Sequence, residues 1–197
     1  MKKLSFFILL SLVTLGVSAQ TDLKWNVNAG IGIASWYGDD TDGADAKFAY
    51  KVGVGLEVPF ANTNVWSFQT GLNFISKGTK ASGVNADWDA VDITANQLYL
   101  ELPLMVGARV HTASNFDILF KGGPYLAYGV GGKTEDIDTF GDDGFGLKRF
   151  DAGLGLGVAF EFDKIVVGIE TGTGFTKVKS GVDAYNISAL ATVGYKF

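Results

Sequence analysis

Charged residues recur at alternate positions within strand-like stretches of this chain of 197 residues. In the stretch YLELPLMVGAR, residues 99–109, Glu101 and Arg109 share one alternating face, and leucine and valine side chains fill the other. Alternation with a period of two predicts β-strands, whose successive side chains point to opposite faces. Opposite charges on one face can form ion pairs, or can relay protons and ions. The polar face of the whole chain carries six acids and six bases: Glu57, Glu101, Asp117, Asp151, Glu161 and Glu170, with Lys51, Lys77, Arg109, Lys121, Arg149 and Lys196.

Two functions are consistent with this balance of charges. The first is a structural network of salt bridges, and the second is a pathway for protons or ions. An unpaired charge inside a protein costs several kcal/mol, so we expect each carboxylate to lie near a cation. Glu101 and Lys121 are predicted to lie close together because a short turn joins their strands. The candidate network consists of Lys51, Glu57, Glu101, Arg109, Lys121, Arg149, Asp151, Glu161 and Glu170.

Catalytic and metal-binding constellations are hard to assemble from the sequence. It has no Cys, and its single His, His111, falls in a predicted short turn without a Ser or Asp pair on a shared strand face. A nucleophilic enzyme needs a nucleophile, a base and an orienting group, and zinc sites need several Cys or His ligands. The GxG runs lie within strands and are followed by no helix, which argues against a dinucleotide site. We therefore expect no enzyme activity.

A second candidate site is an acidic segment in a predicted loop. Asp39, Asp40, Asp42 and Asp45 offer the oxygen ligands that hard divalent cations prefer. One hypothesis is weak Ca²⁺ binding that bridges the protein to anionic lipopolysaccharide, and the other is a solvated acidic rim. The glycine of this segment stands at the wrong offset for an EF-hand, and no other cofactor is expected.

Eight long alternating stretches follow one another without a linker, and each is longer than the five or six residues usual for a globular strand. They are about as long as strands that cross a bilayer at a tilt. The breaks between them are alternately long and short, as in outer-membrane barrels with short turns at one end. We predict one all-β domain, an eight-stranded antiparallel up-and-down transmembrane β-barrel. Its predicted strands are residues 24–36, 47–58, 65–77, 96–110, 116–129, 148–162, 165–177 and 186–197.

The two faces of these stretches differ in chemistry. One carries Val, Leu, Ile and Ala in the middle and aromatic residues near the ends, a distribution that fits lipid with two interfaces. The other carries the charges with files of glycine, such as Gly153, Gly155 and Gly157, which leave room inside a narrow barrel. We predict that the polar face is inside; a soluble lipocalin-like carrier, with the apolar face inside, is the alternative. Eight strands leave an interior that side chains fill, so no wide pore is expected.

The predicted long loops, residues 37–46, 78–95, 130–147 and 178–185, also contain aromatic side chains. Trp88, Phe140 and Phe145 either anchor a protein or lipid partner or pack the loops onto the barrel mouth.

Residues 1–19 have the pattern of a secretory signal peptide. Lys2 and Lys3 precede an apolar run at residues 4–17, and small residues end at Ala19 before Gln20. The run is short for a membrane anchor, and no Cys follows it, which excludes a lipoprotein. We expect an exported protein with a barrel domain at residues 20–197. The formal net charge of −5 argues against nucleic acid as a partner.

The stretch YLELPLMVGAR resembles the tyrosine–leucine–glutamate–hydrophobic–proline–leucine strand of PorT-type outer-membrane β-barrel proteins. Residues 123–129 (GPYLAYG) and 149–157 (RFDAGLGLG) share the resemblance, which spans essentially the whole predicted mature chain, although OmpA/OmpX-like small barrels have the same general pattern. It implies an eight-stranded barrel in a Gram-negative outer membrane, mainly of the Bacteroidetes type, with both termini on the periplasmic side. The terminal Phe197 resembles the signal by which the barrel-insertion machinery recognises its precursors. The family name derives from a member linked to protein secretion, a role we do not carry over because the shared residues are architectural.

Three functional classes remain open on the sequence alone. The favoured one is a structural or surface-interaction barrel that presents acidic extracellular loops. A narrow channel or transporter for a small solute would use the charged lumen. An accessory component of a secretion or envelope-assembly complex would bind an envelope protein partner. Outer-membrane lipid and lipopolysaccharide are expected partners in each case.

Overall fold

The computed structural model describes residues 23–60, 63, 65–84, 90–113, 115–141 and 143–197. The predicted signal peptide at residues 1–19 lies outside these ranges. Within them, no helix is long and apolar enough to cross a membrane.

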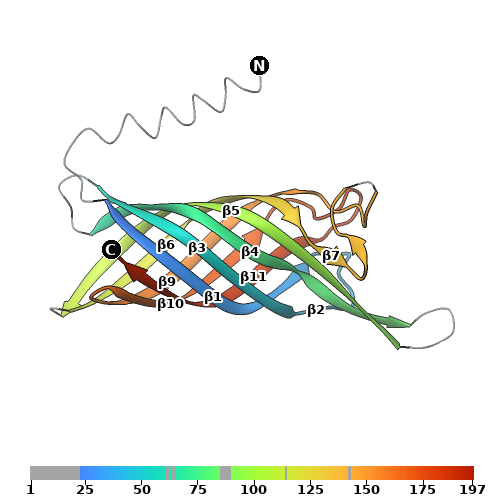
Figure 1. Ribbon diagram of the computed structural model, residues 1–197, viewed down its shortest axis with the longest axis horizontal. Helices are drawn as coiled ribbons and strands as arrows, with labels where there is room; N and C mark the ends of the chain where they lie inside the picture. Colours follow the sequence, from blue (N-terminus) through green and yellow to red (C-terminus); the bar gives the residue numbers. More distant parts are fainter. Residues whose placement is uncertain (1–22, 61–62, 64, 85–89, 114, 142) are drawn as a thin grey trace, which may run out of the picture.

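Eight long strands form a closed antiparallel barrel (Figure 1). Each strand pairs with the next along the chain, and the first pairs with the last, so the sheet has no open edge along its length. The predicted fold class is confirmed. The barrel strands are β1 (Lys24–Tyr37), β3 (Lys47–Pro59), β4 (Trp66–Val84), β5 (Ala90–Ala113), β6 (Phe116–Gly131), β9 (Phe150–Phe162), β10 (Ile165–Gly174) and β11 (Tyr185–Lys196).

The two ends of the barrel differ in the connections they carry. We call the end with the short connections after β3, β5 and β9 the turn end, and the opposite end the loop end. The described chain starts and finishes at the turn end, where the Phe197 amide donates a hydrogen bond of 2.9 Å to the Trp25 carbonyl. Three short strands lie in the connections at the loop end: β2 (Ala44–Asp45), β7 (Lys133–Thr134) and β8 (Ile137–Asp138).

One predicted loop is largely strand. Residues 78–95 were expected to form a loop because they are rich in Gly, Ser and Asp. Instead β4 and β5 stay paired from Gly78↔Asn96 to Val84↔Ala90, and this hairpin extends beyond the other strands at the loop end (Figure 1). The pairing continues because the two strands already share a register in the barrel wall, which offsets the weak strand propensity of these residues.

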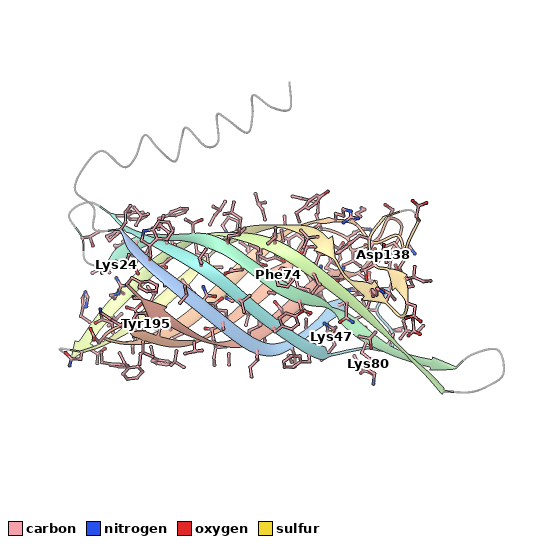
Figure 2. All side chains as sticks on the ribbon, in the orientation of Figure 1. Lys24, Lys47, Phe74, Lys80, Asp138 and Tyr195 are labelled. Carbon is pink, nitrogen blue, oxygen red and sulfur yellow. The ribbon has the colours of Figure 1, made fainter. Side chains whose placement is uncertain are left out.

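The outer wall is apolar, as predicted. Ile31, Leu156 and Ile169 each expose more than three fifths of their surface, far more than an aliphatic side chain in the core of a soluble protein. Figure 2 shows mainly carbon side chains projecting outward along the length of the barrel. The charged face lies inside, which rules out the lipocalin-like arrangement with an apolar interior.

Inward glycines make room for the large side chains of the lumen. A Cβ added at Gly155 would lie 2.4 Å from the Met105 methyl carbon, and one added at Gly153 would lie 2.7 Å from the Tyr125 hydroxyl oxygen. Contacts this short would displace the methionine or the tyrosine. The glycine files therefore set which side chains the narrow interior can hold.

Two prolines interrupt the hydrogen-bonded ladder on the two sides of β5. Next to Pro103, the β4–β5 register skips from Thr70↔Leu104 to Asn73↔Glu101. Next to Pro124, the β5–β6 register skips from Pro103↔Tyr125 to Val106↔Gly122. The register is unchanged across both gaps, so these are missing bonds and not bulges, as expected where a proline has no N–H to donate.

We expect this part of β5 to exchange its amide hydrogens faster than an uninterrupted strand. In detergent micelles, the amides of Leu102 and of residues 104–106 should lose protection before those of residues 52–56 in β3, whose ladders to β1 and β4 are continuous. Hydrogen exchange measured by NMR checks this directly. Equal protection of the two segments would show that the prolines do not weaken the wall.

Candidate functional site in the barrel lumen

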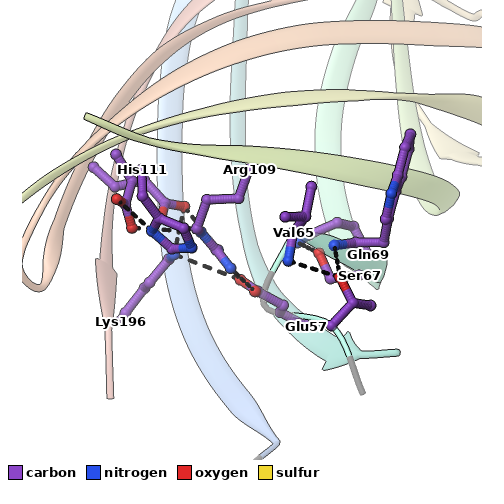
Figure 3. A network of polar contacts seen from close by, with 11 residues as sticks. Glu57, Val65, Ser67, Gln69, Arg109, His111 and Lys196 are labelled. Atoms are coloured by element: carbon purple, nitrogen blue, oxygen red, sulfur yellow. Dashed lines mark hydrogen bonds and ion pairs between the residues drawn. The ribbon is translucent and has the colours of Figure 1, made fainter. Parts of the chain in front are cut away.

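The charges of the lumen form three clusters along the barrel axis. The turn-end cluster centres on Arg109 of β5, which lies between Glu57 of β3 and Glu161 of β9 (Figure 3). Its Nη1 and Nη2 atoms lie 2.7 and 2.8 Å from the two carboxylate oxygens of Glu57. Its Nε lies 2.9 Å from Glu161 Oε2. All three residues are buried, so this planar cation joins three strands through charge-assisted bonds.

Two further pairs complete the turn-end cluster. Lys196 Nζ forms an ion pair with Glu161 and lies 3.5 Å from Glu57 Oε2. His111 Nδ1 lies 2.8 Å from Asp117 Oδ1, and Arg109 Nε lies 3.8 Å from Asp117 Oδ2. The prediction that His111 lies in a short turn, without a Ser or Asp pair on a shared strand face, is wrong in its placement, because β5 continues to Ala113. In β5, His111 lies directly opposite Asp117. The sequence does contain a signal for this placement: His111 stands two residues after Arg109 and therefore falls on the same face of the strand.

The middle triad consists of one carboxylate and two lysines. Glu170 of β10 forms an ion pair with Lys51 of β3, and its Oε1 lies 2.6 Å from Lys121 Nζ of β6. The side chains reach across the lumen from three strands that are not neighbours. This triad therefore braces the barrel from inside.

The loop-end cluster centres on Lys77 of β4, a fully buried lysine. Its Nζ lies 2.8 Å from Glu101 Oε2, 3.2 Å from Asp151 Oδ2 and 3.9 Å from the centre of the Tyr125 ring. The aromatic face and the two carboxylates stabilise the charged ammonium. Asp151 also accepts hydrogen bonds from three neutral groups: the Tyr125 hydroxyl at 3.2 Å, the Thr176 hydroxyl at 2.9 Å and the Asn186 amide at 3.4 Å.

Two placements differ from the sequence-based network. Arg149 was expected in the lumen, but it precedes β9 and lies exposed at the loop-end rim, where it donates to the Gly129 carbonyl and stacks over Phe140. Lys47, which the pattern did not select, is buried instead and donates to the Ser76 hydroxyl at 3.0 Å. Lys47 stands on the same alternating face as Lys51, so the period of two could have identified it. Arg149 stands before the first residue of β9, where the alternation no longer sets the direction of a side chain.

Glu101 and Lys121 share a cavity but not an ion pair. A cavity of about 60 Å³ is lined by both, together with Lys51, Glu170 and several Asn and Gln side chains. Lys121 instead pairs with Glu170, and Glu101 with Lys77. A second cavity of about 50 Å³ adjoins the triad on the side of Glu161. Both cavities are large enough for a few water molecules, and Asn28 Oδ1, a buried acceptor without a protein donor among the described residues, lies at this level.

A loop covers the loop-end mouth of the lumen. Phe140 is buried, with its ring centre 5.5 Å from that of Tyr99 in an edge-on arrangement. It fits over Gly129, where an added Cβ would lie 2.5 Å from the ring. Lys179 Nζ donates to the Phe145 carbonyl at 3.0 Å and lies over its ring. Of the two hypotheses for the loop aromatics, packing onto the mouth holds for Phe140 and Phe145; Trp88 lies outside the described residues.

The acidic segment contributes to a link between two loops. The Asp183 amide donates to Asp40 Oδ2 at 2.7 Å, and the Asp40 amide donates to the Asp183 carbonyl at 3.2 Å. Lys177 forms an ion pair with Asp183 in the open, and this contact lowers the pKa of the aspartate. Among the described residues, which include Asp39, Asp40, Asp42 and Asp45, no three His, Cys, Asp or Glu side chains are grouped as metal ligands.

A family model matches most of the chain. The model is described as the outer membrane protein beta-barrel domain, and it covers residues 12–180. The comparison with curated proteins returned no match.

Several solved barrels have a similar fold. Neisserial surface protein A (NspA) is 12% identical, with 88% of this chain and 97% of that chain covered and a TM-score of 0.53. The outer membrane enzyme PagL is 10% identical, with coverage of 86% and 98% and a TM-score of 0.50. Ail, the attachment invasion locus protein of Yersinia pestis, is 12% identical, with coverage of 88% and 98% and a TM-score of 0.43. At these identities, the likeness to NspA and PagL shows the fold alone.

Removal of the central cation should destabilise the barrel strongly. The substitution Arg109→Met removes the buried guanidinium that Glu57 and Glu161 share and leaves Lys196 as their remaining cation. Breaking a buried ion pair in this way costs about 3–5 kcal/mol. Urea unfolding in lipid vesicles should show this loss. The matched control is Lys148→Met at the exposed loop end, where a change within about 0.5 kcal/mol is expected. Similar stability of the two variants would contradict a structural role for the cluster.

The ion pair between Lys177 and Asp183 in the last loop should be lost in acid. The Lys177 ammonium lowers the pKa of Asp183, so the contribution of this pair to stability is complete above the ordinary carboxyl pKa and is lost as the pH falls through the lowered value. In an NMR titration, the carboxyl carbon of Asp183 should therefore change at a lower pH than that of an ordinary aspartate, which titrates near about pH 4. In the variant Lys177→Met this midpoint should rise, and equal midpoints in the two proteins would contradict the ion pair.

Proposed function

We infer the function from a premise that the comparisons establish: the chain belongs to the outer membrane protein β-barrel domain family, and it is an outer-membrane barrel. We propose that it serves as a structural or surface-interaction protein. In this proposal, a barrel stiffened by its paired lumen charges presents acidic loops outside the cell. In the same proposal, the turn end faces the periplasm, both termini are on the periplasmic side, and Phe197 is the insertion signal. The resemblance to PorT-type barrels supports this orientation.

The observation that carries the proposal is the obstruction of the lumen. Three clusters of paired charges cross it, and Phe140 covers the mouth at the loop end. The cavities beside the middle triad measure about 60 and 50 Å³. They are large enough for a few water molecules but do not form a path for a solute. A barrel filled in this way is suited to mechanical stability and to the display of its loops.

The loops supply a rigid and acidic surface. The first and last loops are joined through Asp40 and Asp183, and the loop after β6 is joined to the last loop through Lys179. Exposed acids in these segments include Asp39, Asp136 and Asp138. Such a surface suits a partner with basic groups, or lipopolysaccharide bridged by divalent cations.

The proposal is non-enzymatic. PagL is described as an enzyme, so catalysis is compatible with this fold. In the described part of the chain, however, the six buried or half-buried carboxylates of the lumen each form an ion pair with a lysine or arginine. These carboxylates are Glu57, Glu101, Asp117, Asp151, Glu161 and Glu170. Ion-paired carboxylates of this kind brace a structure and are poorly placed to act as bases.

A narrow channel is the second candidate. It is favoured by the succession of polar cavities on both sides of the middle triad, which a local rearrangement would join. An accessory role in a secretion or envelope-assembly complex is a third form of the surface-interaction proposal, with a protein as the partner.

Two measurements on the same purified barrel separate these functions. In planar bilayers, the wild-type protein should be silent, whereas conductance steps that change in Lys121→Gln would favour the channel. Vesicles that carry the barrel should bind purified lipopolysaccharide in the presence of Mg²⁺. Substitution of Asp39, Asp42, Asp136 and Asp138 by Asn should reduce that binding several-fold, because the charge of the loops is removed. The control Asp163→Asn changes an acid at the turn end and should leave binding unchanged.

A further inference from the structure

An apolar groove of about 590 Å³ lies on the outer wall, across β4, β5, β6, β9 and β10. It is built from two adjacent rows of the sheet. The row nearer the turn end consists of Ala108, Phe120, Val158 and Ile169, and the next consists of Val106, Gly122, Leu156 and Thr171. Trp66 of β4 closes the first row beside Ala108. The groove is therefore formed by paired residues of neighbouring strands and is not a gap between strands.

Small residues create the groove, and large ones form its walls. Gly122 and Ala108 lie diagonally in the two rows, between the side chains of Phe120, Leu156 and Trp66. The large side chains stand out from the wall, with Phe120 48%, Trp66 49% and Leu156 64% exposed. The Leu156 side chain lies over the glycine: a Cβ added at Gly122 would lie only 2.9 Å from Leu156 Cδ2.

The lining is hydrocarbon almost throughout. Its polar groups are the Thr171 hydroxyl and the backbone at Gly157, and the ammonium of Lys121 points away into the lumen, 2.6 Å from Glu170 Oε1. A groove with this lining offers nothing to a sugar, a phosphate or a charged peptide. It is suited to a chain of methylene groups, which binds through close van der Waals contacts alone.

The position of the groove on the lipid-facing wall indicates that its occupant is lipid hydrocarbon. The groove is continuous with the lipid-facing band of an outer-membrane barrel, so lipid hydrocarbon already surrounds it. It also borders the interrupted part of the β5–β6 ladder, since Val106 and Gly122 are the first pair after the gap at Pro124. A chain that fills the groove would shield that gap and pack the wall where its own bonding is incomplete.

We propose that this groove binds one acyl chain of a phospholipid and holds it as a structural lipid. The groove lies in the half of the wall nearer the turn end, which the proposed orientation places in the periplasmic half of the bilayer. This is the reason for choosing a phospholipid chain over one from lipopolysaccharide. The inference otherwise rests on the lipid-facing wall alone and does not depend on the role of the loops.

Native mass spectrometry of the barrel tests the proposal. The protein is reconstituted in dioleoyl phosphatidylethanolamine, extracted into detergent and delipidated in steps, and the retained lipid is counted. One phospholipid should remain on the wild-type barrel after the bulk lipid is removed. In Gly122→Ile the added side chain occupies the groove, so the retained fraction should fall about tenfold.

Two further variants keep the result interpretable. Ala108→Leu fills the groove from the opposite row and should have the same effect. Ala29→Ile enlarges an exposed residue on β1, outside the groove, and should retain the lipid as the wild type does. Folding of each variant is verified by heat-dependent migration on gels. The proposal is overturned if the folded groove variants retain phospholipid equally, if the wild type retains none, or if added lipopolysaccharide displaces it.

Discussion

The requirement that every backbone polar group be bonded inside a lipid layer governs the rest of this structure. A sheet with an open edge would leave a row of N–H and C=O groups in hydrocarbon, each at a cost of several kcal/mol. The pairing of β1 with β11 removes that edge. Closure with eight strands then determines a narrow interior, and the alternation of side chains determines that this interior is polar.

A narrow polar interior in turn constrains its charges. The turn-end cluster has one carboxylate more than its cations, if His111 is neutral, and the loop-end cluster also has one more. The middle triad has one lysine more than its carboxylate, and Lys47 adds a further cation near the loop end. Clusters of opposite net charge therefore succeed one another along the axis. Each cluster therefore attracts the next one. The excess carboxylates of the two outer clusters are balanced by the excess lysine of the middle triad and by Lys47, so the charges named here sum to zero.

The hydrogen-bonded ladders of the wall are interrupted beside Pro103 and Pro124, at a place where both sides of the wall can accommodate the missing bonds. Pro103 and Met105 line the central polar cavity, where water can reach the backbone groups that lack a ladder partner. On the outer side, the groove around Gly122 borders the second gap. The same few residues of β5 and β6 thus face a hydrated space on one side and hydrocarbon on the other.

The sequence by itself determined the number of barrel strands, their faces and the asymmetry of the two ends, because these depend on a period of two and on local turn composition. It did not determine how far β4 and β5 extend, since their hairpin contains residues of low strand propensity. It also identified most of the charges in the lumen, since parity assigns a side chain to a face. It could not determine the partners: Lys121 pairs with Glu170 and not with Glu101, because contacts across the lumen depend on the stagger between strands distant in sequence. Alternation places Lys47 and His111 on the polar face, and the tertiary structure decided their partners, Ser76 and Asp117. The position of Arg149 at the rim and the closure of the mouth by Phe140 were decided by tertiary structure alone. Both residues lie in the loop between β6 and β9, where alternation does not specify the direction of a side chain.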